Sequence, residues 1–353
     1  MKVLFTYFIS SGGMETLNRH RSKALSQAGI ECHLLYKEQG SGHPNITGIK
    51  TFLMKKTSEI LALVKKEEYD LIVVCTDHQL LRSIKRSGYV GKLVFELQGL
   101  GDYRFTERFF IRHKTTITKA ADAILIPKTA HLIQLAKKYF SALPLFSFHN
   151  CFDVNSFHHV PVAKTISPIA GWVGRIEKNK KWDLFLEIGK RLIERNGNIK
   201  LWMFIDDSLF ELSQKNLFTR KIDKWNLSHN LTVYKNIRNE LMPGYYSQIA
   251  DSGGLLCSTS GIEGFGYTLV EAMSCGCPIL TTDSDGIRSI VENNVTGMII
   301  SQSSIEDAIL KAERIMKNAN LRKRLTRNGY NRIRSIFSLE NYADEFMKMY
   351  WRL

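Results

Sequence analysis

Short apolar runs alternate with longer amphipathic segments along the 353 residues of the chain. The runs are nearly continuous in Val, Ile, Leu and Phe, which is typical of strands buried on both faces of a parallel sheet. The predicted strands are Val3–Ile9, Cys32–Tyr36, Leu71–Cys75, Lys92–Leu97, Ala123–Pro127, Leu145–Phe148, Ile169–Val173, Leu201–Ile205, Leu231–Tyr234, Gly254–Ser258, Pro278–Thr281 and Met298–Ile300. Helices predicted between them include Met14–Ala28, Thr129–Tyr139, Leu184–Arg195 and Thr268–Ser274. This alternation indicates an α/β fold with doubly wound sheets.

The alternation of strands and helices breaks off around residues 152–167, where Pro161 and the following Pro168 interrupt it and no helical or strand pattern is visible. The length suggests two domains of about 150 residues each. We therefore expect one domain over residues 1–158 and a second over 165–337. The last stretch, 338–353, is a helical pattern rich in aromatic residues, and an apolar terminal helix of this kind must dock on a domain.

Composition excludes several classes of protein. Hydrophobic residues make up 44% and charged residues 24%, which disfavours disordered and fibrous chains. The longest uncharged stretches fall short of the roughly 18 residues that a membrane-spanning helix needs. The run Val3–Ile9 leads into Ser-Ser-Gly-Gly without a small-residue cleavage site, so it predicts a first strand and no signal peptide. The six scattered cysteines predict reduced thiols in a cytoplasmic protein, and no zinc-site spacing occurs.

Charge adds a preference for anionic partners. The chain carries 49 Lys and Arg against 34 Asp and Glu, and the first 157 residues alone have a net charge of +9. Such a field attracts nucleotides, nucleic acid or an anionic membrane, but no nucleic-acid module is recognised, so nucleic acid is disfavoured. The segment 104–114 mixes basic and aromatic residues. Two interpretations stay open: it rests on anionic lipid, or it packs its Phe side chains into its own domain.

Three segments carry candidate chemistry. The first, Ser10-Ser11-Gly12-Gly13, follows the first strand, where glycines let backbone N–H groups approach an anion at a helix N-terminus. Taken alone, it is equally well a tight turn without a ligand. In the second segment, Arg175 leaves the end of a buried strand and Lys180 follows near the next helix. Two cations there are placed to neutralise a diphosphate without a metal.

The third segment is the most specific. Glu263 lies in a Gly-rich loop, and Glu271 lies about one turn into the following helix. The intervening glycines expose N–H groups at a helix N-terminus, which is a cradle for an anion. A carboxylate on either side of the cradle is able to accept hydrogen bonds from sugar hydroxyls, as acidic residues do for ribose. The whole string predicts a nucleotide-sugar site.

These motifs resemble the retaining glycosyltransferases of family 4, which have the GT-B fold. The resemblance extends over almost the whole chain, since the Gly-Gly turn matches and His149-Asn150-Cys-Phe-Asp153 is similar to the family's linker entry. It implies two Rossmann-like domains facing each other across a cleft. The first would bind the acceptor, with helix 338–353 packing back on it, and the second would bind the nucleotide-sugar.

The resemblance also implies roles for individual residues. Arg175 and Lys180 match the pair that binds the donor diphosphate, and Glu263 matches the acidic residue near the donor hexose; these are the expected catalytic residues. The expected donor-binding residues are Gly13, Ile237, Gly264, Phe265, Gly266, Tyr267, Thr268 and Glu271. The family uses UDP-, GDP- or ADP-sugars and no metal, so neither a cofactor nor a metal is expected. The triplet Asp283-Ser-Asp285 mimics a metal motif of another fold but is expected to be a loop.

Two departures from the family pattern are visible. Gln98 stands where many members have a His near the sugar, and Gly286-Ile-Arg288-Ser289 replaces Gly-x-Pro-Glu. The prediction is a retaining enzyme that moves a hexose or N-acetylhexosamine, most simply from a UDP-sugar, to a cell-envelope glycan or a lipid-linked acceptor. A cytoplasmic location is expected, with peripheral contact on the inner face of the membrane left open. The alternatives are a sugar-nucleotide epimerase of the same fold and a catalytically silent scaffold in polysaccharide assembly.

Overall fold

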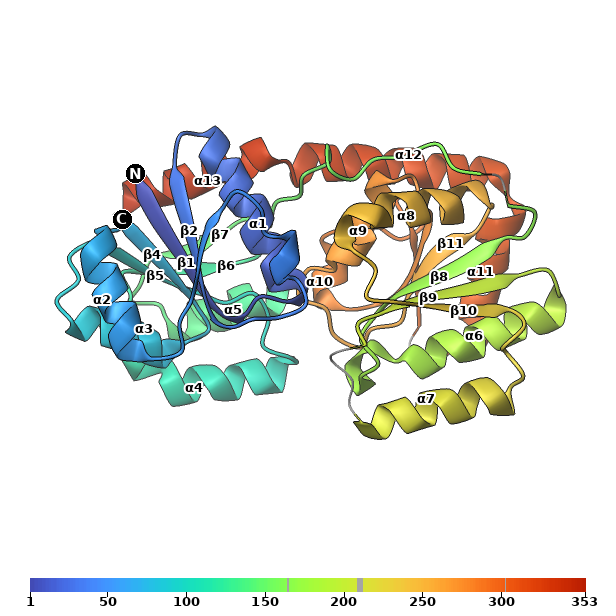
Figure 1. The fold of residues 1–353 in the computed structure, drawn as a ribbon, viewed down its shortest axis with the longest axis horizontal. Coiled ribbons are helices and arrows are strands. Elements are labelled where there is room, and N and C mark those ends of the chain that lie inside the picture. The colour runs from blue at the N-terminus through green and yellow to red at the C-terminus, as the bar shows by residue number, and fades with distance from the viewer. Residues whose placement is uncertain (164, 208–211, 302) are drawn as a thin grey trace. The chain divides into compact units, whose positions relative to one another are not determined.

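A computed structural model of the chain describes residues 1–163, 165–207, 212–301 and 303–353. The chain divides into two compact units (Figure 1). Met1–Asp153 and Ile336–Leu353 form the first unit, and Val154–Ser335 forms the second. The sequence prediction ended the first domain at residue 158, and the first unit ends its main segment at Asp153.

The first unit contains a seven-stranded parallel sheet in the order β3-β2-β1-β4-β5-β6-β7. Its strands are β1 (Lys2–Ile9), β2 (Glu31–Glu38), β3 (Lys50–Leu53), β4 (Leu71–Cys75), β5 (Lys92–Glu96), β6 (Ala123–Ile126) and β7 (Leu145–Ser147). Its helices are α1 (Gly12–Gln27), η1 (His43–Asn45), α2 (Thr57–Glu67), α3 (His78–Arg86), α4 (Tyr103–Ala120), α5 (Ala130–Tyr139) and α13 (Leu339–Arg352). In Figure 1, α1 and α13 cover one face of this sheet and α2 to α5 the other.

The second unit contains a six-stranded parallel sheet in the order β10-β9-β8-β11-β12-β13. Its strands are β8 (Ile169–Gly174), β9 (Lys200–Ile205), β10 (Leu231–Lys235), β11 (Leu255–Ser258), β12 (Ile279–Thr282) and β13 (Met298–Ile300). Its helices are η2 (Lys178–Lys180), α6 (Trp182–Arg195), α7 (Leu212–Lys224), η3 (Asn239–Leu241), α8 (Met242–Asp251), α9 (Tyr267–Ser274), α10 (Asp285–Arg288), α11 (Ile305–Lys317) and α12 (Ala319–Ile336). Figure 1 shows α8 and α9 on one face of the sheet and α6 and α7 on the other.

The predicted α/β fold is confirmed, since every run expected to be a strand is one. β4, β6 and β12 are buried along their whole length, as continuous apolar runs require. One strand escaped prediction: β3 lies at the sheet edge, is only four residues long and is nowhere fully buried. An edge strand of this kind lacks the apolar signal of the central strands.

The C-terminal helix α13 belongs to the first unit and packs along α1. The ring of Phe346 lies 5.8 Å from that of Phe5 on β1, and the ring of Tyr342 lies 5.3 Å from that of Phe148. Both α13 residues are buried, so burial of this aromatic face explains why the end of the chain returns to the first sheet. No helix within the described ranges combines the length and the apolar character that a bilayer crossing requires.

Candidate functional site

The candidate site begins at the carboxyl ends of two adjacent strands of the second unit. Strand β8 precedes Arg175, and its neighbour β11 precedes the Gly-rich loop 259–266. From β8 the sheet continues to β9 and β10 on one side, and from β11 to β12 and β13 on the other, so the strand order reverses between them. Ligands of open α/β sheets bind outside the carboxyl ends of strands at such a reversal.

Arg175 remains accessible at this edge. Its guanidinium contacts the Glu177 carboxylate at 3.3 Å, yet 48% of the side chain is exposed to solvent. An arginine always carries its charge and presents several N–H donors in a fixed plane, which suits it to phosphate oxygens. The structure therefore places an available cation where the sequence predicted one.

Backbone and side-chain hydrogen bonds fasten the turn after β8 to the loop after β11. The Asn179 amide donates to the Ile262 carbonyl at 3.0 Å and accepts from the Ile262 N–H at 3.1 Å. The Gly261 N–H donates to the Asn179 carbonyl at 2.8 Å. Beneath them, buried Thr259 accepts from the Trp172 indole at 3.0 Å and donates to the Lys180 carbonyl at 2.8 Å. The two segments thus form one pre-organised surface.

Two of the predicted catalytic residues meet on this surface. The Lys180 ammonium forms an ion pair with the Glu263 carboxylate, and the two side chains are 20% and 15% exposed. The pair joins the β8 turn to the Gly-rich loop. Because each partner holds the other in place, a ligand that binds there meets a positioned cation and a positioned carboxylate side by side.

The Gly-rich loop leads into α9 through a conformation that requires glycine. Gly266 has a φ of 78°, in the left-handed region, directly before the first residue of α9. Phe265 and Tyr267 flank it with buried rings 4.8 Å apart. Across the loop, a Cβ on Gly286 would lie only 2.2 Å from the Glu263 carbonyl oxygen, so a side chain there would displace the loop. The N-terminal end of α9, with Thr268 in its first turn, supplies the helix N-terminus that the sequence predicted.

Glu271 is buried one turn into α9 and held by two partners from neighbouring elements. Tyr246 on α8 donates to Oε2 at 3.0 Å, and Asn239 donates to Oε1 at 3.3 Å. Burial and the adjacent carboxylate raise the pKa of Tyr246 well above its usual value, so its hydroxyl stays a donor. Asn239 begins η3, two residues after Ile237, the residue expected near the nucleobase, so this segment is tied to α9.

Gly13 and Gln98 lie in the first unit, apart in the chain from the residues above. Gly13 is in the first turn of α1, which begins two residues earlier than the sequence predicted. The loop after β2 closes against Ser10, just before α1, because the Gly40 N–H donates to the Ser10 hydroxyl at 3.0 Å and the Gly42 N–H donates to the Ser10 carbonyl at 3.1 Å.

Both ends of the Gln98 amide are used within the first unit. Its Nε2 donates to Glu96 at 2.8 Å, and its Oε1 accepts from the Asn150 amide at 2.8 Å. Glu96 in turn accepts from Arg21 at both oxygens, each at 2.8 Å, and both members of this ion pair are fully buried. Gln98 is therefore held by an internal polar chain, and its role near a sugar stays a prediction.

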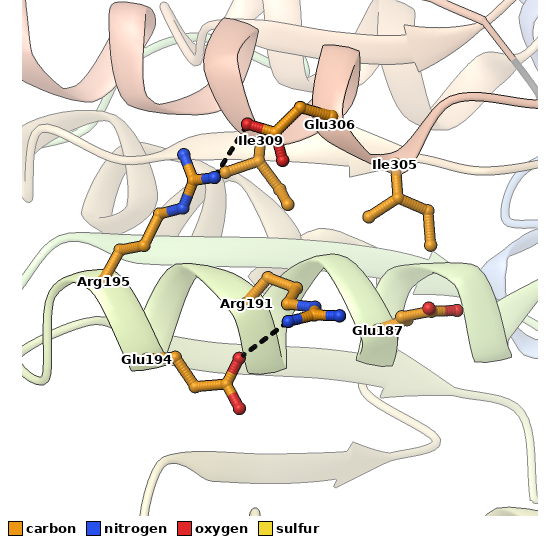
Figure 2. Close-up of a pocket in the computed structure, with 7 residues that line it drawn as sticks. All are labelled: Glu187, Arg191, Glu194, Arg195, Ile305, Glu306 and Ile309. Carbon is orange, nitrogen blue, oxygen red and sulfur yellow. Dashed lines mark hydrogen bonds and ion pairs between the residues drawn. The ribbon is translucent and has the colours of Figure 1, made fainter.

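A separate hollow of about 450 Å³ lies between α6 and α11 (Figure 2). Its charged side chains face one another: Arg195 contacts Glu306 at 2.7 Å, and Arg191 contacts Glu194 at 3.6 Å. None of the predicted site residues lines it. We place the functional site at the strand ends and not in this hollow, because the predicted site residues of the second unit gather where the strand order reverses.

Within the described residues, no group of three or more His, Cys, Asp and Glu side chains is placed to share a metal ion. Asp283 accepts two hydrogen bonds from the Arg288 guanidinium, at 2.8 and 2.6 Å. Hydrogen bonding from Arg288 lowers the pKa of Asp283. Asp283 and Ser284 follow β12 in a loop, as predicted, but the prediction was wrong for Asp285, which begins α10.

The sequence profile described as glycosyl transferases group 1 matches residues 155–332, just over half of the chain. The chain belongs to this family. It is 26% identical over 192 residues to the capsular polysaccharide biosynthesis glycosyltransferase CapM of Staphylococcus aureus, covering 52% of this chain and 45% of CapM. It is 21% identical over 257 residues to a poly(ribitol-phosphate) alpha-N-acetylglucosaminyltransferase of Staphylococcus aureus (strain COL), covering 71% of this chain and 47% of that protein.

The fold agrees with the family. The structure of Anabaena Alr3699/HepE in complex with UDP and glucose superposes with a TM-score of 0.83 at 14% identity and covers 100% of both chains. The predicted GT-B fold and the resemblance to the group 1 family are thereby confirmed. The chain spans about half the length of these two curated relatives.

Several residues that shape the site were not predicted from the sequence. Asn179 joins the turn after β8 to the Gly-rich loop, and Tyr246 and Asn239 hold Glu271. Gly286 has no side chain, which leaves room for the backbone of the Gly-rich loop. Tyr246 and Asn239 lie 25 and 32 residues from Glu271 in the sequence, so no local spacing reveals them. Gly286 was detectable from the sequence, because it keeps the glycine of the family's Gly-x-Pro-Glu pattern although Arg288 and Ser289 replace the Pro and the Glu.

Proposed function

We propose that the protein is a retaining glycosyltransferase that transfers a hexose or N-acetylhexosamine from a UDP-sugar to a cell-envelope glycan or lipid-linked acceptor. The observation that carries the proposal is the edge of the six-stranded sheet between β8 and β11. There an accessible Arg175, the Lys180–Glu263 ion pair and the N-terminus of α9 adjoin the strand-order reversal.

The chemistry of donor cleavage explains why cations are needed at this edge. As the bond between the anomeric carbon and the diphosphate breaks, negative charge grows on the leaving oxygen. Donors fixed in advance near that oxygen stabilise the transition state, and removal of one typically lowers turnover by about 10²–10³. In this assignment Arg175 and Lys180 supply the positive charge without a metal, and N–H groups of Gly264 to Thr268 complete the anion site.

The two carboxylates bind the sugars of the donor in this scheme. Glu263, held by Lys180, accepts hydrogen bonds from hydroxyls of the transferred hexose. Glu271 accepts from the ribose hydroxyls in this scheme, with Asn239 and Tyr246 fixing the orientation of its carboxylate. The backbone at Ile237 meets the nucleobase in this scheme, and Asn239, two residues further on, ties this segment to α9.

The mechanism we propose has no protein nucleophile. The departing phosphate oxygen takes the proton of the acceptor hydroxyl on the same face of the sugar, so the new bond forms with the configuration retained. Arg175 and Lys180 hold this phosphate while the proton moves. Exclusion of water from the site protects the activated sugar from hydrolysis.

The choice of donor and acceptor follows relatives, and both stay proposals. The HepE structure is a complex with UDP and glucose, which favours a uridine donor here. CapM is named for capsular polysaccharide biosynthesis and the other relative for a poly(ribitol-phosphate) acceptor, which favours an envelope glycan. The acceptor-binding role of the first unit and a cytoplasmic location are proposed on the same family basis.

The test is a product assay with a panel of nucleotide-sugars. The full chain is incubated with UDP-, GDP- and ADP-sugars in EDTA, with and without lipid-linked and glycan acceptors. We expect a glycosylated product with retained anomeric configuration from a UDP-sugar only when an acceptor is present. Conversion of the donor to an isomer without acceptor would establish the epimerase. Loss of all turnover despite donor binding would establish the silent scaffold.

A further inference from the structure

The outer face of α4 in the first unit carries a row of positive charges. Arg104, Arg108, Arg112 and Lys119 are all exposed. Their spacings of four, four and seven residues place them on one side of a helix. The only acidic residue of α4 is Glu107, and its carboxylate is bonded at 2.9 Å to Lys138 and at 2.8 Å to Tyr139. The basic face therefore has no carboxylate of its own helix to neutralise it.

Two apolar side chains project from the same helix beside these charges. Phe105 is 52% exposed and Ile111 is 59% exposed. The inner side of α4 is occupied by Phe110 and Ile117, which are fully buried in the core of the unit. The two interpretations left open by the sequence thus apply to different residues: Phe110 packs inside, whereas Phe105 stays outside. Fold stability explains the apolar side chain at position 110, which is buried, but not the one at position 105, which is exposed.

Helix α12 provides an internal comparison. It has the same length of 18 residues and exposes four cations, which are Lys323, Arg324, Arg327 and Arg334. No large apolar side chain of α12 is exposed, although every residue of this helix is described. A partner that recognises positive charge alone is expected to bind both helices. A partner that also accepts apolar groups has reason to bind α4 alone.

We propose that the outer face of α4 docks the first unit on an anionic membrane surface. Lipid phosphates would pair with Arg104, Arg108 and Arg112, while Phe105 and Ile111 enter the boundary between headgroups and acyl chains. This partner fits better than nucleic acid, because a phosphate backbone recognises the cations but leaves the two apolar side chains in water. The proposal does not rest on the glycosyltransferase activity, since it uses no residue of the donor site.

The experiment is sedimentation of the full chain with vesicles. One set contains phosphatidylcholine mixed with phosphatidylglycerol, and the other contains phosphatidylcholine alone. We expect binding to the mixed vesicles only. The combined substitution Arg104→Glu, Arg108→Glu and Arg112→Glu is expected to weaken it by about 100-fold or more, as each basic residue near a surface contributes about fivefold. The matched control Lys323→Glu, Arg324→Glu and Arg327→Glu on α12 is expected to change it far less.

A second variant separates lipid from other polyanions. Phe105→Ser with Ile111→Ser leaves the charge unchanged, and we expect it to weaken vesicle binding by about tenfold or more. All substituted side chains are exposed, so an unchanged melting temperature verifies that each variant is folded. Equal losses from the α4 and α12 reversals, or binding that ignores Phe105 and Ile111, would overturn the proposal. Salt-sensitive binding to duplex DNA that does not depend on Phe105 and Ile111 would assign the face to nucleic acid instead.

Vesicle binding requires no turnover, so the two proposals fail independently. A chain that binds vesicles but transfers no sugar would contradict the proposed function alone. A chain that transfers sugar to a soluble acceptor but ignores anionic vesicles would contradict the membrane proposal alone.

Discussion

Arg21 in the first unit and Arg175 in the second show two uses of the same side chain. Arg21 is fully buried, bonded to Glu96 and stacked with its guanidinium carbon 3.8 Å from the centre of the Phe5 ring. Arg175 keeps 48% of its side chain exposed at the end of β8. A buried pair of this kind is committed to the fold, whereas a half-exposed cation at the end of a strand remains available to a ligand. Arg21 is therefore a structural residue of the first unit, whereas Arg175 has the exposure that the proposed ligand-binding role requires.

The largest expected effect comes from breaking the buried pair. Arg21→Met leaves the Glu96 carboxylate buried without its partner, which typically destabilises a protein by about 3–5 kcal/mol. Urea unfolding measures the change. The matched control Arg288→Met breaks the exposed pair with Asp283 and is expected to change stability little. Equal effects of the two substitutions would refute the distinction between committed and available arginines.

Arg175→Ala is the converse experiment. We expect kcat/KM for transfer to fall by about 10²–10³, equivalent to about 2.7–4 kcal/mol of transition-state stabilisation, with unfolding unchanged. The control is Lys178→Ala, which removes an exposed cation from the same turn. It is expected to retain most activity. Near-normal turnover of Arg175→Ala would remove this residue from the catalytic site.

Gly286→Ala tests whether the Gly-rich loop must hold its position. The new Cβ would lie 2.2 Å from the Glu263 carbonyl oxygen and 2.4 Å from that of Gly264, so the loop must move. Overpacking of this kind costs about 1–3 kcal/mol, and UDP affinity should fall with the displaced loop. Gly244→Ala is the control, because no atom lies within 4 Å of its added Cβ. A variant at position 286 with unchanged stability and UDP affinity would contradict the close approach.

The smallest effect concerns pH and the first unit. Burial, together with the nearby Arg19 charge, lowers the pKa of His20 to about 3. Below about pH 6.5 the imidazole of His20 is protonated in the unfolded chain but stays neutral in the folded chain. The free energy of unfolding therefore falls as the pH falls toward 3. His20 alone should account for about 1.4 kcal/mol between pH 8 and pH 5.5. His20→Gln should flatten the stability profile by this amount, and an unchanged slope would show that His20 is protonated in the fold.

Sequence reasoning found the elements with the strongest apolar signal. β4 and β12 are buried on both faces and were predicted to within one residue. β3 was missed because its four residues lie half-exposed at the sheet edge. The same limit applies to the site, where Arg175, Lys180 and Glu263 stood out by motif while their supports did not.

Long-range partners explain what the sequence left out. Gln98 was noticed as a replacement for His, but its hydrogen bond to Asn150 spans 52 residues, so its internal tethering could not be foreseen. Tyr246 has no motif of its own and acts only through Glu271. Motifs reveal groups that face a ligand, whereas the groups that hold them depend on packing between distant segments.

The central claim is that the carboxyl edge of the second sheet binds the pyrophosphate of the donor through Arg175. Calorimetric titration of UDP and of uridine into wild-type chain and Arg175→Ala tests it most directly, because the two ligands differ only in their phosphates. We expect Arg175→Ala to weaken the affinity for UDP by about 10–100-fold and to leave the affinity for uridine unchanged. Unchanged affinity for UDP, or an equal loss for uridine, would contradict the claim.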